Sequence, residues 1–532
     1  MSKRKVKIIV VAVVVVILAA VLCGIGVANN VTDGMFNWNT PTKITKNSTV
    51  TGTIESKDDY EAYVFEIDKA GALSVRLDHD DMLDSVKCGY RVTLYKIIEG
   101  ETREYKELSY FDSFWNDVTA SWGETGVSPG TYLVVVDSGT DILYGEFTLV
   151  TTFTASSTFE KEVNDEKETA NPLGVGKALY GSSSKRSDGY DNDWFVFELL
   201  QDSCINISFV HDDLTFPKAG WNIKIINEND EVVSDFTSKL TDTLIKTGTI
   251  GLKAGVYYIK VENVSEIAET YSIVLNAKNA VNNEFELNDT PETATDLPQN
   301  IAISGSLADR LLSLDKDYYK INVPAEGVVD IIFSHEELEG DKDGWNIRLL
   351  KKLEDGTYLE IMKKISKWNS SGYNLSNMGL SAGEYYIVID GDSLAYNSTS
   401  YTCQWTFTER SDFEIEPNGS MELAKDIQAN TYYYGAIISS DVDFDEDYYR
   451  FEITEERNVS LELWHEKVTD SSVTWVASII DENGNVVKSV DSSLNQGLVS
   501  TGVMTLKEGT YYVKIETGMY GSESPYYFKL VR

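Results

Sequence analysis

The sequence predicts an all-β protein in which four tandem antiparallel β-sandwich domains, with jelly-roll or Greek-key-like topology, follow an N-terminal hydrophobic helix. Three observations carry this prediction. A chain of 532 residues is too long for a single core. A phrase of strand-like residues recurs four times, and no long segment beyond the N-terminus shows helical periodicity. The predicted boundaries are 1–28 for the hydrophobic segment, 29–44 for a lead-in segment, and 45–154, 155–279, 280–410 and 411–532 for the sandwiches.

The composition is that of a folded and strongly acidic protein. Hydrophobic residues make up 42% and charged residues 25%, so neither a disordered chain nor a multispanning membrane protein fits. The net charge of −39 excludes nucleic acid and anionic lipid as partners and favours cations. The chain has only four His and four Cys, so the residues most used in acid–base and nucleophilic catalysis are scarce.

The N-terminus has the pattern of an export signal. Basic residues cluster among the first seven positions, and an uncharged apolar stretch follows at 8–28. This order directs the N-terminus inward, so residues from Asn29 onward are expected outside the cytoplasm. The stretch is long enough to anchor the chain in a membrane, while Gly26, Val27 and Ala28 offer the small residues of a signal peptidase site. Both readings stay open, and the membrane is expected only through this segment.

Each predicted sandwich carries, near its end, a phrase of an apolar residue, Gly and Tyr at fixed spacing. The four phrases lie at 127–132, 252–257, 380–385 and 506–511. Each phrase leads into a segment of period two, in which residues that face the core alternate with residues that face solvent, as expected for a half-buried strand. The arrangement resembles the tyrosine corner of Greek-key sandwiches, in which the Tyr hydroxyl ties a loop to the following strand.

A second landmark precedes the middle of each copy, where a Gly is followed by an acidic loop and an Asp-x-Asp-aromatic strand. In copies two to four, ten residues separate the Gly from the first Asp: Gly181 from Asp191, Gly305 from Asp315, and Gly435 from Asp445. Copy one is divergent, because Gly52 lies only seven residues before Asp59 and the second acid is Glu61.

The four histidines occupy one equivalent place, the end of a strand followed by an acid. They are His79, His211, His335 and His465. Strand alternation places each ring on the face of the preceding apolar residues, so we expect hydrogen-bonded structural histidines at the core rim. General bases or zinc ligands are not favoured, because each copy supplies one His alone. Repeated aromatic residues are expected in the core as well: Tyr90, Trp221, Trp345 and Trp475.

Copies two to four are each preceded by a Glu-x-Glu-x-Asn segment, here called the acidic linker. The linkers lie at 160–165, 284–289 and 414–419, and copy one has none. Alternating acids on an extended segment put both carboxylates on one face. The Asn amide and the adjacent acid add further hard oxygens, of which calcium takes about 6–8. The alternative is a set of solvated acids in an acidic protein. Recurrence at matched distances from the Asp-x-Asp favours a metal site.

These three features, the acidic linker, the Gly-to-Asp-x-Asp strand and the late Gly-x-Tyr strand, resemble the bacterial pre-peptidase C-terminal domain. That family is related to the collagen-binding domain of bacterial collagenases, and the likeness covers nearly the whole exported chain. It implies calcium ligands from linker and sandwich together. In copy two they are Glu160, Glu162, Asn164 and Asp165 with Asp191 or Asp193; in copy three Glu284, Glu286, Asn288 and Asp289 with Asp315 or Asp317; in copy four Glu414, Glu416 and Asn418 with Asp445 or Asp447, where Gly419 replaces the acid.

The sequence thus predicts a noncatalytic, calcium-stabilised array at the cell surface or in the extracellular space, serving as a binding or spacer module. An alternative motivated by the resemblance is direct attachment to an insoluble polymer, either a collagen-like protein or a polysaccharide. A third hypothesis is a hydrolase, although nearly every residue is assigned to a sandwich. No disulfide framework is expected, because the cysteines beyond the N-terminal segment, Cys88, Cys204 and Cys403, fall in different copies.

Overall fold

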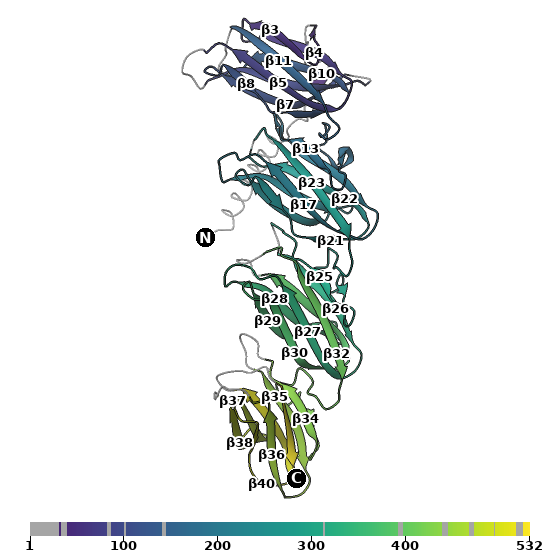
Figure 1. Ribbon diagram of the computed structural model, residues 1–532, viewed down its shortest axis with the longest axis vertical. Coiled ribbons are helices and arrows are strands. Elements are labelled where there is room, and N and C mark those ends of the chain that lie inside the picture. Colours follow the sequence, from purple (N-terminus) through teal and green to yellow (C-terminus); the bar gives the residue numbers. More distant parts are fainter. Residues whose placement is uncertain are drawn as a thin grey trace, which may run out of the picture. The chain divides into compact units, whose positions relative to one another are not determined.

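The computed structural model describes residues 31–32, 40–81, 87–100, 103–140, 145–265, 267–311, 314–391, 397–438, 445–467, 473–493, 495–517 and 525–532. This part of the chain is all-β as predicted, and its regular elements are strands apart from one 3-10 turn (Figure 1). Among these residues, no helix has the length and apolar character needed to cross a membrane. The predicted hydrophobic segment at 1–28 lies outside them.

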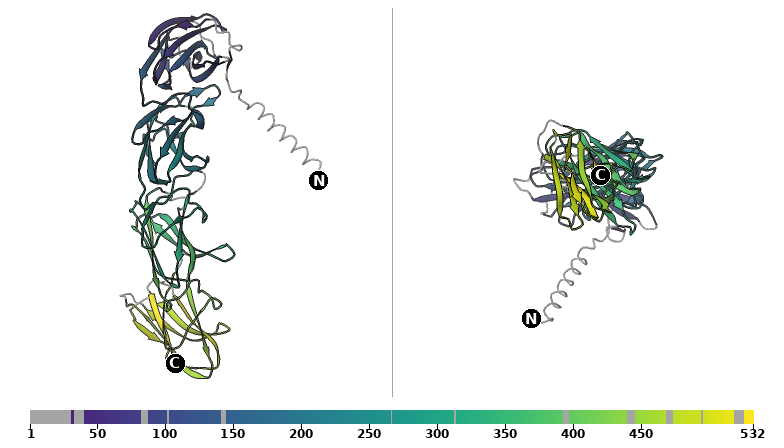
Figure 2. Two further views of the ribbon diagram at one scale, coloured as in Figure 1. Left: turned by 90° about the vertical axis from the view of Figure 1, so that its right-hand side faces the viewer. Right: turned by 90° about the horizontal axis from the view of Figure 1, so that it is seen from below.

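The chain divides into two compact units. The first comprises Met1–Leu200, Asn206–Lys246 and Ala254–Ala277, and the second Gln201–Ile205, Thr247–Lys253 and Lys278–Arg532. The strands form four successive pairs of sheets, and the two layers of each pair are seen in Figures 1 and 2. Independent folding of four domains stays a prediction.

The first pair has a six-stranded sheet, in the order β1-β7-β6-β10-β4-β2, and a five-stranded sheet, in the order β3-β11-β5-β8 with β9 on β5. The strands are β1 (Val31–Thr32), β2 (Thr42–Lys43), β3 (Ser48–Ile54), β4 (Tyr60–Ile67), β5 (Gly71–His79), β6 (Cys88–Ile98), β7 (Glu104–Phe114), β8 (Thr119–Ser121), β9 (Thr125–Val127), β10 (Gly130–Ser138) and β11 (Gly145–Ala155). The predicted lead-in segment at 29–44 therefore supplies two edge strands.

The second pair consists of β12-β16-β22-β18-β19 and β13-β23-β17-β20, with β21 on β17 and a small β14-β15 ribbon. Its elements are the 3-10 turn η1 (Lys167–Thr169), β12 (Asn171–Pro172), β13 (Ala178–Ser182), β14 (Lys185–Arg186), β15 (Gly189–Tyr190), β16 (Asn192–Leu199), β17 (Ser203–His211), β18 (Ala219–Asn227), β19 (Val232–Lys239), β20 (Leu244–Lys246), β21 (Ile250–Leu252), β22 (Gly255–Asn263) and β23 (Thr270–Asn279).

The third pair consists of β24-β26-β31-β28-β29 and β25-β32-β27-β30. Its strands are β24 (Thr295–Asp296), β25 (Ile303–Gly305), β26 (Lys316–Val323), β27 (Gly327–His335), β28 (Asp343–Lys352), β29 (Tyr358–Lys367), β30 (Gly372–Leu380), β31 (Gly383–Gly391) and β32 (Tyr401–Glu409).

The fourth pair consists of β33-β35-β41-β37-β38 and β34-β42-β36-β39, with β40 on β36. Its strands are β33 (Lys425–Asp426), β34 (Tyr432–Ala436), β35 (Glu446–Ile453), β36 (Arg457–His465), β37 (Val473–Asp481), β38 (Val486–Ser493), β39 (Leu498–Ser500), β40 (Met504–Leu506), β41 (Gly509–Thr517) and β42 (Pro525–Val531).

The prediction of purely antiparallel sheets is wrong at one edge of each pair. There a two-residue strand runs parallel to the strand with the paired acids: β2 on β4, β12 on β16, β24 on β26 and β33 on β35. The remaining ladders are antiparallel, and sequence neighbours are often separated within a sheet, as crossovers between two sheets require. In copies two to four, the parallel edge strand comes soon after the acidic linker, so it helps to place the linker beside the Asp-x-Asp strand.

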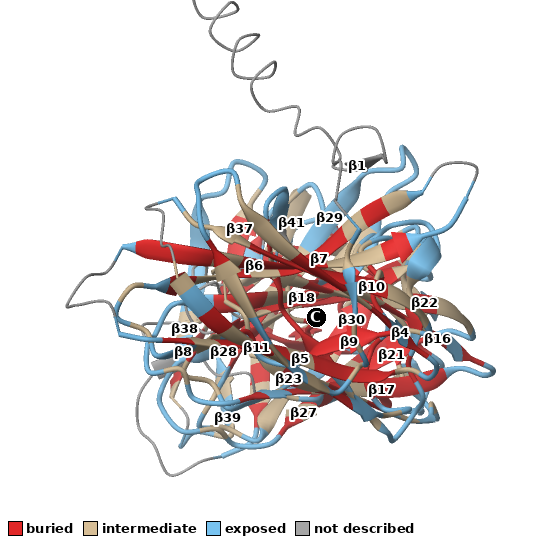
Figure 3. Ribbon diagram, turned by 90° about the horizontal axis from the view of Figure 1, so that it is seen from above, coloured by how far each residue is buried: buried red, intermediate tan, exposed pale blue. Residues whose placement is uncertain are grey.

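Buried residues alternate along the strands and form the core of each pair. The buried stretches are red in Figure 3. In β36, for example, Val459, Leu461 and Leu463 are fully buried and pack with Val513 and Ile515 of the opposite sheet. Loss of apolar surface to water at these positions is the main stabilising contribution. No disulfide links the three cysteines of the described chain, which agrees with the prediction.

The predicted roles of His and Trp are confirmed. Every imidazole Nε2 meets a Ser hydroxyl of a neighbouring strand, in the pairs His79–Ser113, His211–Ser238, His335–Ser366 and His465–Ser492, at 2.6–2.9 Å. Each Nδ1 meets the backbone oxygen of the following acid. The rings also pack on the repeated core aromatics Tyr90, Trp221, Trp345 and Trp475, which are buried. Both nitrogens are therefore used structurally.

The predicted tyrosine corner is seen in copies one, three and four. The Tyr132, Tyr385 and Tyr511 hydroxyls donate to the backbone oxygen four residues earlier, at 2.6, 3.0 and 3.2 Å. The bond closes the turn that precedes each late strand.

Tyr132→Phe tests this contact. Because the hydroxyl is buried, its loss leaves Ser128 O without its donor, and we expect a cost of about 1 kcal/mol in the free energy of unfolding. Tyr511→Phe is the matched control, since that hydroxyl is exposed and water can replace it. Calorimetric unfolding of the full chain measures both, and equal losses would contradict the corner's role.

Candidate metal centres

Each acidic linker is anchored at its first Glu to the strand that bears the landmark Gly. The backbone bonds run from Glu160 N to Tyr180 O (2.9 Å), from Glu284 N to Ser304 O (3.0 Å) and from Glu414 N to Tyr434 O (2.9 Å). Each acceptor directly precedes the Gly, so the Glu side chain lies over a position without a side chain.

The landmark glycines are required by this close approach. A Cβ at Gly305 would lie 2.4 Å from the Tyr319 hydroxyl and 2.7 Å from the Glu284 carboxylate. At Gly435 it would lie 2.6 Å from Glu414 Oε2. The spacing seen in the sequence therefore reflects a Glu seated on a bare backbone.

The second Glu of each linker is anchored to the preceding copy. Its amide donates to a Gly carbonyl, in the pairs Glu162–Gly126, Glu286–Gly251 and Glu416–Gly379, at 3.2, 2.9 and 2.8 Å. A Cβ on any of these glycines would meet the linker backbone or the first Glu side chain at 1.8–2.4 Å. The sequence analysis missed these glycines, although each directly precedes a late Gly-x-Tyr phrase. The fourth copy has Thr505 there.

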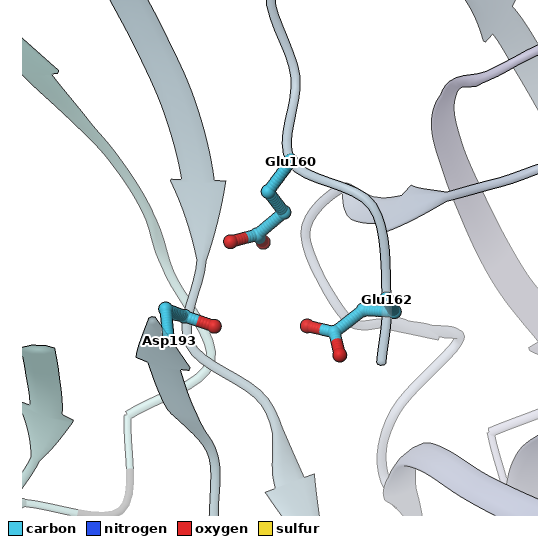
Figure 4. A group of neighbouring side chains, drawn as sticks. All are labelled: Glu160, Glu162 and Asp193. Carbon is cyan, nitrogen blue, oxygen red and sulfur yellow. The ribbon is translucent and has the colours of Figure 1, made fainter. Parts of the chain in front are cut away.

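Together these anchors bring the predicted linker glutamates and the second Asp of each Asp-x-Asp into one buried place, here called the inner group. One carboxylate oxygen from each residue lies within 4.8 Å of the others. In Figure 4 the carboxylates of Glu160 and Glu162 point toward that of Asp193. The inner groups are Glu160, Glu162 and Asp193 (site 2); Glu284, Glu286 and Asp317 (site 3); and Glu414, Glu416 and Asp447 (site 4).

The predicted Asn ligands also lie in these sites, fully buried. Asn288 and Asn418 donate from Nδ2 to the first Glu of their linkers at 3.2 and 3.4 Å, and in both the Oδ1 atom has no hydrogen-bond partner. Asn164, with its amide turned to satisfy its neighbours, donates to Glu162.

The first Asp of each Asp-x-Asp belongs to a different arrangement, here called the outer group. In site 2 it holds Glu162, Asp165 and Asp191, and in site 3 Glu286, Asp289 and Asp315. A guanidinium lies among these acids: Arg186 in site 2 and Arg310 in site 3. Sequence reasoning missed both arginines. The signal was available, because each lies five residues before the first Asp.

Site 4 lacks the arginine. Position 440, five residues before Asp445, is a Ser, and the linker acid is replaced by Gly419. Asp445 accepts from the Ile438 amide at 2.8 Å, and its charge acts on Glu416.

The residues present fit a hard divalent cation at each inner group. Buried carboxylate oxygens without any hydrogen-bond donor occur in all three: Glu160 Oε2, Asp317 Oδ1, Glu416 Oε1 and Asp447 Oδ1. Such atoms are costly to bury, and an ion in their midst would satisfy them. Carboxylate and amide oxygens are the ligands of calcium and magnesium, while the imidazoles are engaged elsewhere.

The pKa values of the buried carboxyls are raised because these groups lie close together and away from water. Burial, with repulsion from Asp191, raises the pKa of Glu160 to about 8. Burial raises the pKa of Asp315 to about 8 although Arg310 opposes the shift. Burial and the Asp445 and Asp447 carboxylates raise the pKa of Glu416 well above its usual range. Tyrosine hydroxyls supply part of the compensation, since Tyr271 and Tyr401 donate to Asp193 and Asp317 at 2.6 Å.

Comparison with known proteins gives similarities of low score. The pre-peptidase C-terminal domain of collagenase from Bacillus anthracis is 16% identical, over 21% of this chain and 95% of that chain, with a TM-score of 0.17. The CUB1-EGF-CUB2 domain of human MASP-1/3 is 10% identical, over 43% and 99%, with a TM-score of 0.15. A peptide-N(4)-(N-acetyl-β-D-glucosaminyl) asparagine amidase is 9% identical, over 43% and 96%, with a TM-score of 0.19. No family model matches. Scores this low carry no argument about function, which must rest on the side chains.

The raised pKa values predict how calcium stabilisation depends on pH. In the metal-free folded state the carboxyls bind protons more tightly than in the unfolded chain, where they titrate near about 4.5. Their stabilising contribution is therefore present below that pH and is lost as the pH rises through about 7 to 8. A calcium ion bound to these carboxylates would replace the protons, so its effect on Tm should be larger at pH 8 than at pH 5. Calorimetry with and without calcium at both pH values measures this, and a larger shift at pH 5 would contradict it.

Proposed function

We propose that the chain is an exported, noncatalytic array of four β-sandwich domains, in which calcium orders the acidic linkers and the array serves as a binding or spacer module outside the cell. The observation that carries the proposal is the inner group, built three times from equivalent residues with buried oxygens that have no donor. Each linker joins one pair of sheets to the next, so an ion there would act on the junction itself.

The choice of calcium follows from the ligands and the compartment. All donors are hard oxygens, and calcium tolerates irregular shells better than magnesium does. The basic N-terminus followed by the apolar stretch at 8–28 supports an extracellular or cell-surface location, where calcium sites of about 10⁻⁴–10⁻³ M affinity can be occupied.

A noncatalytic role is supported by how the chain uses its reactive side chains. All four histidines are held by two hydrogen bonds each at core rims. The perturbed carboxyls lie within the linker sites, where anchoring a segment accounts for their burial.

Glu284→Gln combined with Glu286→Gln tests the metal sites. The pair removes two of the three inner carboxylates of site 3, so the chain should bind one calcium ion fewer and lose part of its calcium-induced Tm shift. Titration calorimetry and thermal unfolding of the full chain measure both quantities. The control is Glu339→Gln with Glu354→Gln, which removes the same charge from exposed positions. Unchanged stoichiometry in the first variant, or no binding by the parent, would count against the sites.

A second function, attachment to an insoluble polymer, is favoured by one surface. On the outer face of the fourth pair, here called the aromatic face, Tyr432 and Tyr434 of β34, Trp464 of β36 and Tyr527 of β42 lie in mutual contact. Lys529 lies over the rings of Tyr432 and Trp464, at 4.6 and 5.5 Å. The corresponding strand of the third pair, β32, presents Thr402 and Gln404 instead. Grouped, partly exposed aromatics are typical of binding surfaces.

Trp464→Ala with Tyr432→Ala tests the aromatic face. If it binds polymer, the fraction of protein pelleted with collagen fibrils or with a cell-wall polysaccharide should fall at least about tenfold, because aromatic contacts dominate such interfaces. Tyr358→Ala is the control, as Tyr358 is an exposed aromatic of the third pair that also packs on a Tyr. Absence of the parent protein from every pellet would contradict attachment and leave the spacer role.

A further inference from the structure

The arginines of the outer groups act as cations built into the chain. Arg186 donates to Asp165 Oδ1 at 2.5 Å and to Glu162 Oε2 at 3.2 Å, and it also contacts Asp191 Oδ1. Its side chain is only 4% exposed. The oxygens that it contacts belong to residues grouped closely enough to hold a metal ion. The guanidinium therefore occupies the position among these oxygens that a metal ion would otherwise take.

Site 3 repeats the arrangement. Arg310 donates to Asp289 Oδ1 at 2.7 Å and to Glu286 Oε2 at 3.1 Å, and it lies 2.9 Å from Asp315 Oδ1. In both sites, two of the contacted acids come from the linker and one comes from the loop before the Asp-x-Asp strand. Each arginine thus ties its linker to the sandwich by charged bonds that need no metal.

In the first unit, these charged contacts also reach a strand of the preceding pair of sheets. Arg186 Nε donates to Leu108 O of β7 at 3.0 Å, and Lys106 of the same strand lies 3.5 Å from Asp165. The guanidinium therefore holds three segments together: the linker, the loop before β16 and a strand of the first pair of sheets.

Site 4 has lost the arginine and one acid together. Sites 2 and 3 each hold five carboxylates and one guanidinium, whereas site 4 holds four carboxylates and has Gly419 and Ser440 at the equivalent positions. Counted over these carboxylates and guanidinium groups alone, the formal charge is −4 in every site, and site 2 has Lys106 beside Asp165 in addition. The carboxylates of site 4 therefore attract a divalent ion at least as strongly as those of site 3. What site 4 lacks is the arginine contact that joins the linker to the sandwich without a metal ion. The chain between Ile438 and Asp445 contains no Lys or Arg that could supply it.

Without an ion, the contacts that hold the fourth linker include hydrogen bonds from neutral donors. The Ala436 amide and the Tyr449 and Tyr526 hydroxyls donate to the Glu414 carboxylate. Glu414 and Glu416 keep their backbone bonds, and Lys425 donates to the carbonyls of Ser411 and Phe413, which precede the acids. The carboxylates of Glu414, Glu416 and Asp447 nevertheless lie within 4.8 Å of one another, and Glu416 Oε1 and Asp447 Oδ1 have no hydrogen-bond donor. Among the described residues no cation lies between them. Buried carboxyl oxygens without a donor are costly, and in this site no guanidinium lowers that cost.

We propose that the three linkers differ in their need for calcium: Arg186 and Arg310 keep the linkers of copies two and three docked when the ion is absent, whereas the linker of copy four docks only with the ion bound. This inference rests on the proposed calcium sites. Its consequence is that calcium switches one junction, the one between the third and fourth pairs of sheets, while the other two linkers stay in place.

Hydrogen exchange of the full chain, in millimolar calcium and in excess chelator, tests the proposal. The readout is the protection of the linker amides at 160–162, 284–286 and 414–416, which are hydrogen-bonded to the neighbouring strands. Chelation should lower protection of the third segment by about 100-fold or more and that of the first two by less than about tenfold. Equal losses in all three segments would overturn this inference and leave calcium binding intact. An absence of any calcium effect would overturn the proposed function itself.

Arg310→Ser with Asp289→Gly converts site 3 to the pattern of site 4. Its linker should then lose protection on chelation as strongly as that of copy four, while the linker of copy two serves as an internal reference. The control variant, Arg457→Ser with Glu455→Gly, removes an ion pair at the surface of the fourth pair, away from β33 and β35, and should change none of the three responses. A site 3 linker that stays protected in the converted variant without calcium would contradict the role of the arginine. Should that variant unfold, the contrast between linkers two and four in the parent chain decides the matter.

Discussion

Burial of the linker carboxylates is the constraint on which the rest of the structure depends. Glu160, Glu284 and Glu414 are almost wholly removed from water, and each sits over a glycine with its amide bonded to the adjacent backbone. A buried carboxylate is tolerated only with donors or cations around it. Amide and hydroxyl donors supply part of this compensation, and protons on the carboxyls or a bound cation would supply the rest.

The core positions and the inner groups could be predicted from the sequence. The reason is that equivalent residues recur at matched spacing in several copies, whereas a single motif would have been ambiguous. Alternation along the strands placed His335 and Trp345 in the core, and matched spacing placed Glu284 and Glu286 beside Asp317. The assignment of one ligand set per copy was less successful, since Asp315 lies in the outer group with Arg310. The reason is local: β26 begins at Lys316, so Asp315 precedes the strand and its direction is not set by alternation.

The remaining features depend on contacts between segments that are far apart in the chain. Gly126 is needed because the linker of the next copy passes over it, and nothing in its own neighbourhood demands a glycine. Arg186 meets Asp165 and Glu162 across about twenty residues of intervening chain, so its role could not be read from a local pattern. Only comparison between copies would have revealed that the arginine and the linker acid occur together.

The differences between copies then become informative about function. Replacing Asp and Arg by Gly419 and Ser440 leaves the formal charge of site 4, counted over carboxylates and guanidinium groups alone, equal to that of its counterparts, so the change removes the arginine contact without weakening the attraction for a divalent ion. The same copy carries the aromatic face of β34, β36 and β42, whereas β32 of the third pair has Thr402 and Gln404 at the corresponding place. The linker that we propose to depend on calcium and a distinctive surface therefore occur in one repeat. In such an array the first repeats would act as a constant support, and the last would be the part whose attachment calcium controls.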